Sequence, residues 1–271
     1  LEFRRVLFRS EHKIQFKKEE IGGDGALLRE THVFIYKVNF IEKIMATTLA
    51  KLSNFIPEGG IWMNTQRPEW NDANNALVGN GVSMVTLYYL RRFLVFFKEV
   101  LAQTKHQEVA ISDELLQCYT QMKETLANSI EVLKAPISDQ QRKNILDGLG
   151  VPASDYRQKI YDEDFSGKKS ALLLNDLAEF IDLALAHLHH TIDANKRQDS
   201  LYHAYNLMTV VDGGGISIAH LPEMLEGQVA ALSSGYLSAE RSLEVMDALK
   251  ASALFREDQY SYVLYPNKSL P

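Results

Sequence analysis

Hydrophobic residues recur every three or four positions over most of the chain from residue 41 onward, and this spacing predicts a mainly α-helical protein. Strands and helices do not alternate regularly, so a doubly wound α/β fold is disfavoured. Paired helices without a sequence repeat fit a helical bundle, a solenoid or a closed ring of helical hairpins, and the spacing does not choose among them. The predicted helices cover residues 41–55, 76–103, 112–133, 138–149, 154–164, 170–194, 222–235 and 238–251.

Two segments depart from the helical spacing. Short stretches of β-branched and aromatic residues at 13–16 and 32–38 flank a Gly-Gly-Asp-Gly breaker at 22–25, which predicts strands or an irregular lead-in. Residues 205–220 change to a period near two around the glycines at 213–215, which predicts a β-hairpin. We therefore expect a short β or irregular N-terminal segment and one β-hairpin inserted among the helices.

Composition and charge exclude several classes of protein. The chain has 271 residues, a formal net charge of −6, 46% hydrophobic residues and a single cysteine, Cys118, which excludes a disulfide-stapled scaffold. The 29 lysines and arginines are scattered, so we expect no nucleic-acid partner. The longest apolar runs are too short to cross a bilayer, so we expect no membrane partner. The sequence does not determine the oligomeric state.

The two ends of the sequence differ from the rest. Residues 1–10, LEFRRVLFRS, resemble the translation of a sequencing-adaptor oligonucleotide, so we treat them as an artefact outside the fold. Residues 11–40 form the lead-in and residues 41–271 the helical domain. The final residues, 265–271, show neither a polar tail nor the end of a helix. We therefore expect a piece of a longer chain, truncated at both ends.

A polar stretch that holds both tryptophans lies between the first two predicted helices, at residues 62–79. Pro68 favours an extended conformation for Arg67, so we expect a shaped loop. A Trp ring covers the apolar face of a sugar while acids, amides and arginine bind its hydroxyl groups, so this composition is typical of a carbohydrate site. A carboxyl group buried beside another acid can stay protonated and donate to a glycosidic oxygen, and Asp72, with Glu69 three residues away, fits this role.

The same residues allow a purely structural interpretation. Asp72 lies just before a predicted helix, where the helix dipole lowers a carboxyl pKa, so desolvation has to outweigh that effect for Asp72 to act as an acid. In the structural alternative, Asn71, Asp72 and Asn74 cap the helix and Trp70 packs in the core. The chemistry of the residues alone leaves the two interpretations about even.

The stretch Glu69-Trp70-Asn71-Asp72 resembles the Asp-Trp-Asn-Asp-Gly signature of the cellobiose and chitobiose phosphorylase family, and related loops occur in other six-hairpin glycosidases. The second Asp of the signature, the general acid of the family, corresponds to Asp72. The first Asp corresponds to Glu69, which keeps the carboxylate, and Ala73 replaces the glycine. The resemblance covers about a dozen residues and implies that the helices form a partial (α/α)6 toroid.

The resemblance also implies an activity: a carbohydrate-active enzyme that cleaves a glycosidic bond of an oligosaccharide with inversion, by hydrolysis or by phosphorolysis. Asp72 then protonates the leaving oxygen, Arg67, Glu69 and Asn71 position it or the sugar, and Trp70 forms an apolar wall. No metal and no organic cofactor are implied. A phosphorylase uses inorganic phosphate as a co-substrate, and we would expect it in the cytoplasm.

A second candidate stretch, at residues 202–228, combines aromatic, amide and acidic side chains. His203, Tyr205 and Asn206 cluster where a long helix ends, a place that suits contacts with substrate. An inverting hydrolase needs a base that activates water about 6.5–9.5 Å from the acid, and Glu226 is the candidate, with Glu223 beside it. The alternative is that both glutamates are there because acids favour the first turn of a helix.

Three histidines invite a metal interpretation, but only His187 and His190 share a helix face, and no acidic third ligand is evident. We expect these two and His189 to line a polar cavity or the surface. The rival hypothesis for the whole chain is a non-catalytic helical scaffold or a carbohydrate-binding module in which Asp72 is only a helix cap.

Overall fold

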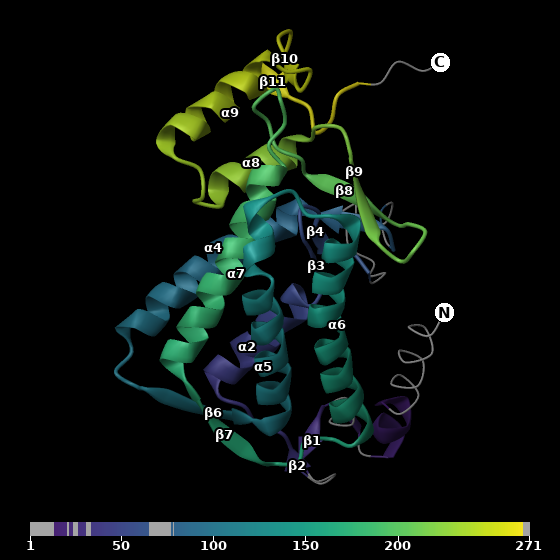
Figure 1. Cartoon of the computed structure of the whole chain (residues 1–271), viewed down its shortest axis with the longest axis vertical. Coiled ribbons are helices and arrows are strands. Elements are labelled where there is room, and N and C mark those ends of the chain that lie inside the picture. The colour runs from purple at the N-terminus through teal and green to yellow at the C-terminus, as the bar shows by residue number, and fades with distance from the viewer. Residues whose placement is uncertain are drawn as a thin grey trace.

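The structure is a computed structural model that describes residues 14–20, 22–23, 27–30, 34–64, 77 and 79–267. Long helices lie side by side through the body of the molecule, and a short helical pair sits above them (Figure 1). The described helices are α2 (Phe40–Leu52), α4 (Met84–Gln103), α5 (Asp113–Asn128), α6 (Asp139–Asp162), α7 (Leu174–Ala194), α8 (Leu225–Ser233), α9 (Ala239–Ala251) and the 3₁₀ helix η2 (Ile130–Lys134).

An antiparallel five-stranded sheet accompanies the helices, in the order β3-β4-β5-β8-β9. Its strands are β3 (Phe55–Ile56), β4 (Gly60–Trp62), β5 (Gly81–Ser83), β8 (Tyr205–Val210) and β9 (Ile216–His220). Two-stranded ribbons of β1 (Arg29–Glu30) with β2 (Phe34–Ile35) and of β6 (Glu108–Ser112) with β7 (Lys169–Leu173) lie at the opposite end of the long helices (Figure 1). A third ribbon joins β10 (Phe255–Arg256) to β11 (Ser261–Tyr262). The protein is mainly α, as the spacing predicts.

The main core lies between α2, α4, α5 and α7, where side chains such as Met45, Leu94, Met122 and Phe180 are almost fully buried. A second, smaller core of Ile56, Val82, Leu146 and Ile216 joins one face of the sheet to α6. The sheet is thus covered on this face by a helix, which buries its apolar positions away from water.

Several helix starts agree with the sequence prediction because serine caps hold them. The Ser112 hydroxyl accepts from the Leu115 N–H and the Ser238 hydroxyl from the Arg241 N–H. Ser138 and Gln141 form a complete capping box at the start of α6. Each cap satisfies an N–H group that has no partner within the helix.

Two predicted helices begin later than their spacing suggests, because strands precede them. The prediction of helix over 76–103 is wrong at its start: residues 79–80 turn, residues 81–83 form β5, and α4 begins at Met84. Gly79, with φ +97°, breaks the helical path. Likewise, residues 169–173 pair with β6, so the helix predicted over 170–194 begins at Leu174. An apolar run such as 172–174 fits a buried strand as well as a helix.

Other boundaries also change. The helices predicted over 138–149 and 154–164 are the single helix α6, which continues through the buried Pro152. Gly148 permits a close approach of α6 to Thr125 of α5, and this packing outweighs the hydrogen bond that proline removes. The helix predicted over 222–235 spans only Leu225–Ser233, the one predicted over 41–55 ends at Leu52, and residues 14–20 are helical rather than extended.

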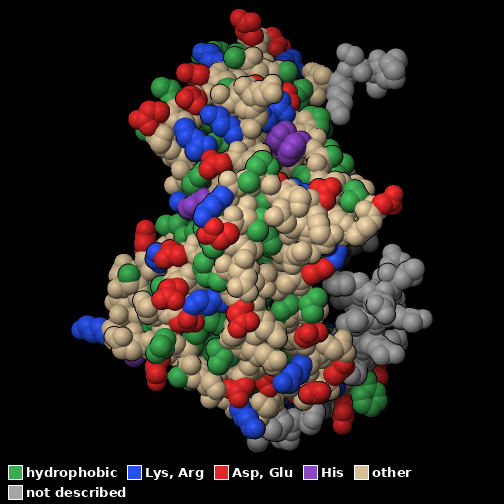
Figure 2. All heavy atoms as spheres, viewed as in Figure 1, with side chains coloured by type: hydrophobic (Ala, Val, Ile, Leu, Met, Phe, Trp, Pro, Cys, Tyr) green, Lys and Arg blue, Asp and Glu red, His purple; other side chains and the backbone are tan. Residues whose placement is uncertain are grey.

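The surface matches the scattered charge of the sequence. Figure 2 shows acidic and basic side chains interspersed over the visible face rather than gathered into a field of one sign. Among the described helices, none combines the length and the apolar content that crossing a membrane requires.

Candidate functional site

The first candidate stretch emerges from the middle of the sheet. Its proposed site residues (Arg67, Glu69, Trp70, Asn71 and Asp72) lie outside the described residues, but the structure describes both stems of the loop that carries them. The loop leaves the end of β4 and returns into β5, and these two neighbouring strands are antiparallel. We call residues 63–80 the acid loop.

Hydrogen bonds close the two stems of the acid loop on each other. The Met63 N–H donates to the Gly81 carbonyl and the Gly79 N–H to the Met63 carbonyl, both at 2.9 Å. The Trp62 indole N–H donates to the Gly79 carbonyl at 2.9 Å. The Asn64 amide donates to the Asn54 side chain at 2.5 Å, which ties the outgoing stem to the end of α2. The acid loop is therefore an insertion whose ends are fixed by the sheet, the arrangement in which loops commonly carry function.

A cross-strand row runs from the acid loop to the edge of the sheet. Trp62, Val82, Asn206 and His220 are successive partners on β4, β5, β8 and β9, so their side chains share one face. Three steps between strands separate the Trp62 and His220 backbones by about 14 Å. The row starts apolar beside the acid loop and becomes polar towards β9.

At the turn between β3 and β4, the backbone of Glu58 has a φ of +60°, which is uncommon outside glycine. Two side chains of α7 and its C-terminus hold it there. The Glu58 N–H donates to the Thr191 hydroxyl at 3.0 Å, and the Glu58 carbonyl accepts from the Asn195 amide at 2.8 Å. A strained residue fixed from several sides is a feature to examine for function or for architecture.

The Glu58 side chain meets a buried arginine. Arg142 of α6 is 5% exposed, and its guanidinium donates to the Glu58 carboxylate at 2.6 Å. The Ile137 N–H and His190 Nε2 approach the other carboxylate oxygen at 3.0 and 3.3 Å. Glu58, Arg142, His190, Thr191 and Asn195 together form what we call the turn cluster.

Every donor of Arg142 has a partner. Besides Glu58, it donates to Asp139 and to the carbonyls of Pro57, Ile137 and Ile216, at 2.7 to 2.9 Å. These partners come from the β3–β4 turn, the start of α6 and β9. A buried charge that is paired and fully hydrogen-bonded acts as a joint between elements, so the turn cluster is architectural.

Two buried asparagines connect the turn cluster to the cross-strand row. Asn195 donates to the Glu58 and Thr191 carbonyls, so its remaining side-chain oxygen accepts, and it accepts from Asn206 at 2.8 Å. Asn206 also donates to the Gly59 carbonyl at 2.7 Å, which leaves its own oxygen to accept from His220 at 2.8 Å. Both asparagines are fully buried. Asn206 therefore positions its neighbours and offers no free group to a ligand.

His203 and His220 form a stacked pair, which we call the histidine pair. Their ring centroids lie 4.1 Å apart with the planes inclined by 8°. His203 Nδ1 lies 3.1 Å from the Leu221 carbonyl. Burial, together with the neighbouring His220, lowers the pKa of His203 to about 4, and partial burial also lowers the pKa of His220. Both rings are therefore neutral near pH 7.

The second candidate stretch is brought together by the structure. The Gln228 side chain accepts from the Tyr202 N–H and donates to the Tyr202 carbonyl, both at 2.8 Å. Gly227 lies so close to Ala204 that a Cβ would meet its Cβ at 2.7 Å. The first turn of α8 thus packs against Ala204, the residue that follows His203. Tyr205 is 2% exposed and belongs to the interior rather than to a surface.

The two glutamates of this stretch have different surroundings. Glu223 forms an ion pair with Arg197 at 3.1 Å. Glu226 is partly buried and, among the described residues, makes neither a hydrogen bond nor an ion pair. Of the two, Glu226 is the one with a carboxylate available to a ligand or a water molecule.

The three histidines of α7 take separate places. His187 is buried in the core, with Nε2 3.0 Å from the Leu126 carbonyl, and burial lowers its pKa. His189 stacks on Tyr236, and His190 contacts Glu58. Within the described ranges, no three His, Cys, Asp or Glu side chains are arranged to hold a metal ion.

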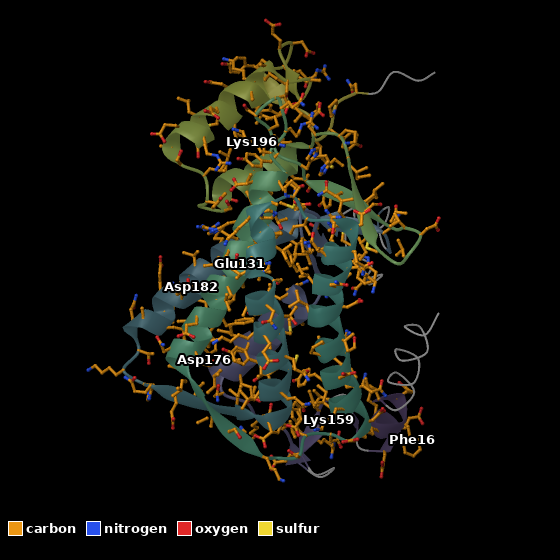
Figure 3. The ribbon with its side chains drawn as sticks, in the orientation of Figure 1. Phe16, Glu131, Lys159, Asp176, Asp182 and Lys196 are labelled. Atoms are coloured by element: carbon orange, nitrogen blue, oxygen red, sulfur yellow. The ribbon has the colours of Figure 1, made fainter. Side chains whose placement is uncertain are left out.

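An open groove between α5, η2 and α7 is lined by three apolar residues and by Lys123, Glu179 and Asp182, which already have partners. Lys123 pairs with Asp176 and with Glu179, and Lys98 pairs with Asp182. Asp176 and Asp182 are labelled in Figure 3. Burial alone would raise the pKa of Asp176, but hydrogen bonds from Lys123 and Tyr119 lower it overall. The groove is a set of surface ion pairs rather than a binding site.

Sequence reasoning missed Glu58, Arg142 and His220. The signal available was the Pro-Glu-Gly-Gly run at 57–60, in which a glutamate stands at the tip of a tight turn before two glycines. Interpreted as the end of a helix, that run does not point to a partner 84 positions later. The chain matches no protein-family model, and no curated protein is significantly similar to it.

Proposed function

We propose that this chain is the acid-bearing part of a carbohydrate-active enzyme that cleaves a glycosidic bond with inversion. The acid loop is the observation behind the proposal. Its sequence is rich in Trp, Asp, Glu, Asn and Arg, it connects the inner strands β4 and β5, and hydrogen bonds join its two stems. A rigid frame around a polar, aromatic loop suits binding and general acid catalysis of a sugar. The proposed fold is part of an (α/α)6 toroid of helical hairpins.

In this proposal Asp72 donates a proton to the leaving glycosidic oxygen. Glu69, three residues away, is a second carboxylate that favours the protonated form of Asp72. Arg67 and Asn71 orient the sugar or the acid, and Trp70 covers an apolar sugar face. General acid catalysis of this kind contributes about 10²–10⁴-fold to the rate.

The nucleophile distinguishes two forms of the reaction. In hydrolysis a base removes a proton from water, and Glu226 is the proposed base because its carboxylate has no partner among the described residues. In phosphorolysis inorganic phosphate attacks directly and no base is needed. Neither form requires a metal or an organic cofactor.

The test compares the full chain with its Asp72→Asn variant on cellobiose, chitobiose and maltose, each with and without inorganic phosphate. We expect product release by the native chain and a loss of about 10²–10⁴-fold in kcat with Asp72→Asn. Phosphate dependence then identifies phosphorolysis, and its absence together with a loss in Glu226→Gln identifies hydrolysis.

The matched control is Asp212→Asn, since Asp212 is an exposed acid at the tip of the β8–β9 turn. This variant should cleave as the native chain does. Equal activity of the native chain and Asp72→Asn would overturn the acid assignment. No cleavage of any of the three sugars, with binding of one retained, would instead favour a carbohydrate-binding module.

A further inference from the structure

The histidine pair offers hydrogen-bond acceptors that nothing else in the described structure uses. His203 Nδ1 faces the Leu221 carbonyl, which can only accept, so the proton of His203 is on Nδ1. His220 Nδ1 faces the Asn206 side-chain oxygen. That oxygen is identified by the two bonds that the Asn206 amide nitrogen donates, to Gly59 and Asn195. The proton of His220 is therefore also on Nδ1.

Both rings consequently present a bare Nε2. Neither Nε2 has a partner among the described residues, and both side chains are partly accessible to solvent, His220 more than His203. The backbone carbonyl and the buried asparagine fix each tautomer and each ring orientation, as outer contacts do for histidines that bind ligands. The result is one lone pair of fixed direction on each ring of the stacked pair.

We propose that the histidine pair is a binding subsite for neighbouring hydroxyl groups of a neutral sugar, with each Nε2 accepting from one hydroxyl. The identity of the ligand as a sugar rests on the proposed function. His220 ends the cross-strand row that starts at Trp62, about 14 Å away at the stem of the acid loop. Val82 and Asn206, which lie between them in the row, are fully buried, so a sugar bound to the pair does not lie along the row. The pair thus lies apart from the described stems of the acid loop.

The geometry disfavours other ligands. An Nε2 lone pair lies in the plane of its ring, so the lone pairs of two stacked, nearly parallel rings do not converge on one metal ion. Near pH 7 both rings are neutral and offer no positive charge to an anion. Among the described residues, the charge of Arg197 acts on both rings, that of Asp199 on His203 and that of Glu58 on His220. Arg197 is itself engaged by Asp199 and Glu223. A neutral ligand rich in hydrogen-bond donors fits these surroundings.

The first test uses nuclear magnetic resonance of the full chain labelled with ¹⁵N at histidine. Two-bond ¹H–¹⁵N spectra report which ring nitrogen carries the proton. We expect an unprotonated Nε2 on both His203 and His220 near pH 7, and an Nε2–H on either ring would overturn the proposal.

The second test titrates the Asp72→Asn variant, which we expect to cleave only slowly, with cellobiose, chitobiose and maltose. The Nε2 resonances of His203 and His220 should move with at least one sugar, while those of the exposed His106 stay fixed. Octa-O-methyl cellobiose, which lacks hydroxyl donors, should move neither. Equal shifts with the methylated sugar, larger shifts with inorganic phosphate or zinc, or no shift with any of the three sugars would each contradict the subsite.

Substitutions test whether sugar binding needs the ring nitrogens or only a flat ring. His203→Phe and His220→Phe keep a flat ring but remove Nε2 together with Nδ1, so each should weaken sugar binding roughly two- to tenfold or more, the share of at least one neutral hydrogen bond. His106→Phe is the matched control and should leave the affinity unchanged. If a variant fails to fold, the titration of the Asp72→Asn chain decides alone.

Failure of this subsite and failure of the proposed function are distinguishable. Histidine shifts with a sugar, combined with cleavage that Asp72→Asn does not slow, leave the subsite standing and remove the acid assignment. Cleavage that depends on Asp72, combined with silent histidine resonances, does the reverse.

Discussion

The turn cluster and the histidine pair are built from similar groups, yet they differ in what they leave unpaired. In the turn cluster, Arg142 uses all five donors on partners from three elements. In the histidine pair, each ring uses Nδ1 on a fixed oxygen, and its Nε2 has no partner in the part of the chain that the structure describes. A closed network stabilises a fold, whereas an oriented group without a partner is available to a ligand. Asn195 and Asn206 join the two regions, so the first holds the second in place.

The largest expected effect comes from breaking the hydrogen-bond network of the turn cluster. Arg142→Ala leaves the Glu58 carboxylate without its cation, together with several carbonyls, so we expect a loss of about 3–5 kcal/mol in the free energy of unfolding. Urea denaturation measures it. A double variant, Glu58→Gln with Arg142→Met, should recover part of the loss because no buried charge remains. A loss under about 1 kcal/mol for Arg142→Ala would show that the cluster is not a joint.

The next largest effect comes from removing the side chain of Asn206, which connects the turn cluster to the histidine pair. Asn206→Ala removes donors from Gly59 and Asn195 and the acceptor from His220, so we expect a loss of about 2–3 kcal/mol in unfolding free energy. Because His220 then loses its oriented partner, its proton should distribute over both ring nitrogens in the ¹⁵N spectrum. A His220 tautomer that does not change would mean that Asn206 does not set it.

Acidification should lower the free energy of unfolding, because the unfolded chain protonates its histidines more readily than the folded chain does. The folded pKa of His203, about 4, is below the ordinary value of 6.5, so between these pH values the unfolded chain binds more protons than the folded one. Stability therefore rises with pH through this window and falls on acidification. Since His203 is partly exposed, we expect its share to be about 1–2 kcal/mol between pH 6.5 and pH 4.

Urea denaturation at several pH values measures this dependence. His203→Phe should flatten the curve, and His106→Phe should not. Since burial also lowers the pKa values of His187, His189 and His220, part of the slope will remain in His203→Phe. A curve for His203→Phe that coincides with that of the native chain would contradict the depressed pKa.

The smallest effect serves as the reference for both regions. Lys196 pairs with Glu244 at 3.3 Å on the surface, where Lys196 is labelled in Figure 3. Lys196→Ala should change the unfolding free energy by about 0.5 kcal/mol or less, because water screens an exposed pair. A change as large as that of Arg142→Ala would mean that the contribution of an ion pair to the stability of this chain does not depend on its burial.

The sequence predicts those parts of the fold that depend on local signals. Ser112, Ser138 and Ser238 cap helices at the predicted positions because capping involves residues only three apart. The starts of α4 and α7 were predicted too early, since pairing of 81–83 with β8 and of 169–173 with β6 depends on segments far away in the sequence. Pro152 misled the prediction of α6 because packing against α5 overrides a local breaker.

The candidate site divides in the same way. Composition singled out the acid loop and the stretch around His203 and Glu226, because unusual residues stand close together in the sequence. It did not find the pairing of Glu58 with Arg142, 84 positions apart, or the stacking of His203 on His220. Such partners are set by the sheet and by α6, and no local spacing encodes them. For the same reason, Asn206, which the sequence predicts to bind substrate, instead positions its neighbours.

The most direct test of general acid catalysis varies the leaving group. A sugar leaving group needs a proton from Asp72, whereas 2,4-dinitrophenolate leaves without one. We therefore measure kcat/KM of the native chain and Asp72→Asn on cellobiose and on 2,4-dinitrophenyl β-glucoside. The account predicts a loss of about 10²–10⁴-fold on cellobiose and little loss on the dinitrophenyl glycoside. Equal losses on both substrates, or no loss on either, would contradict it.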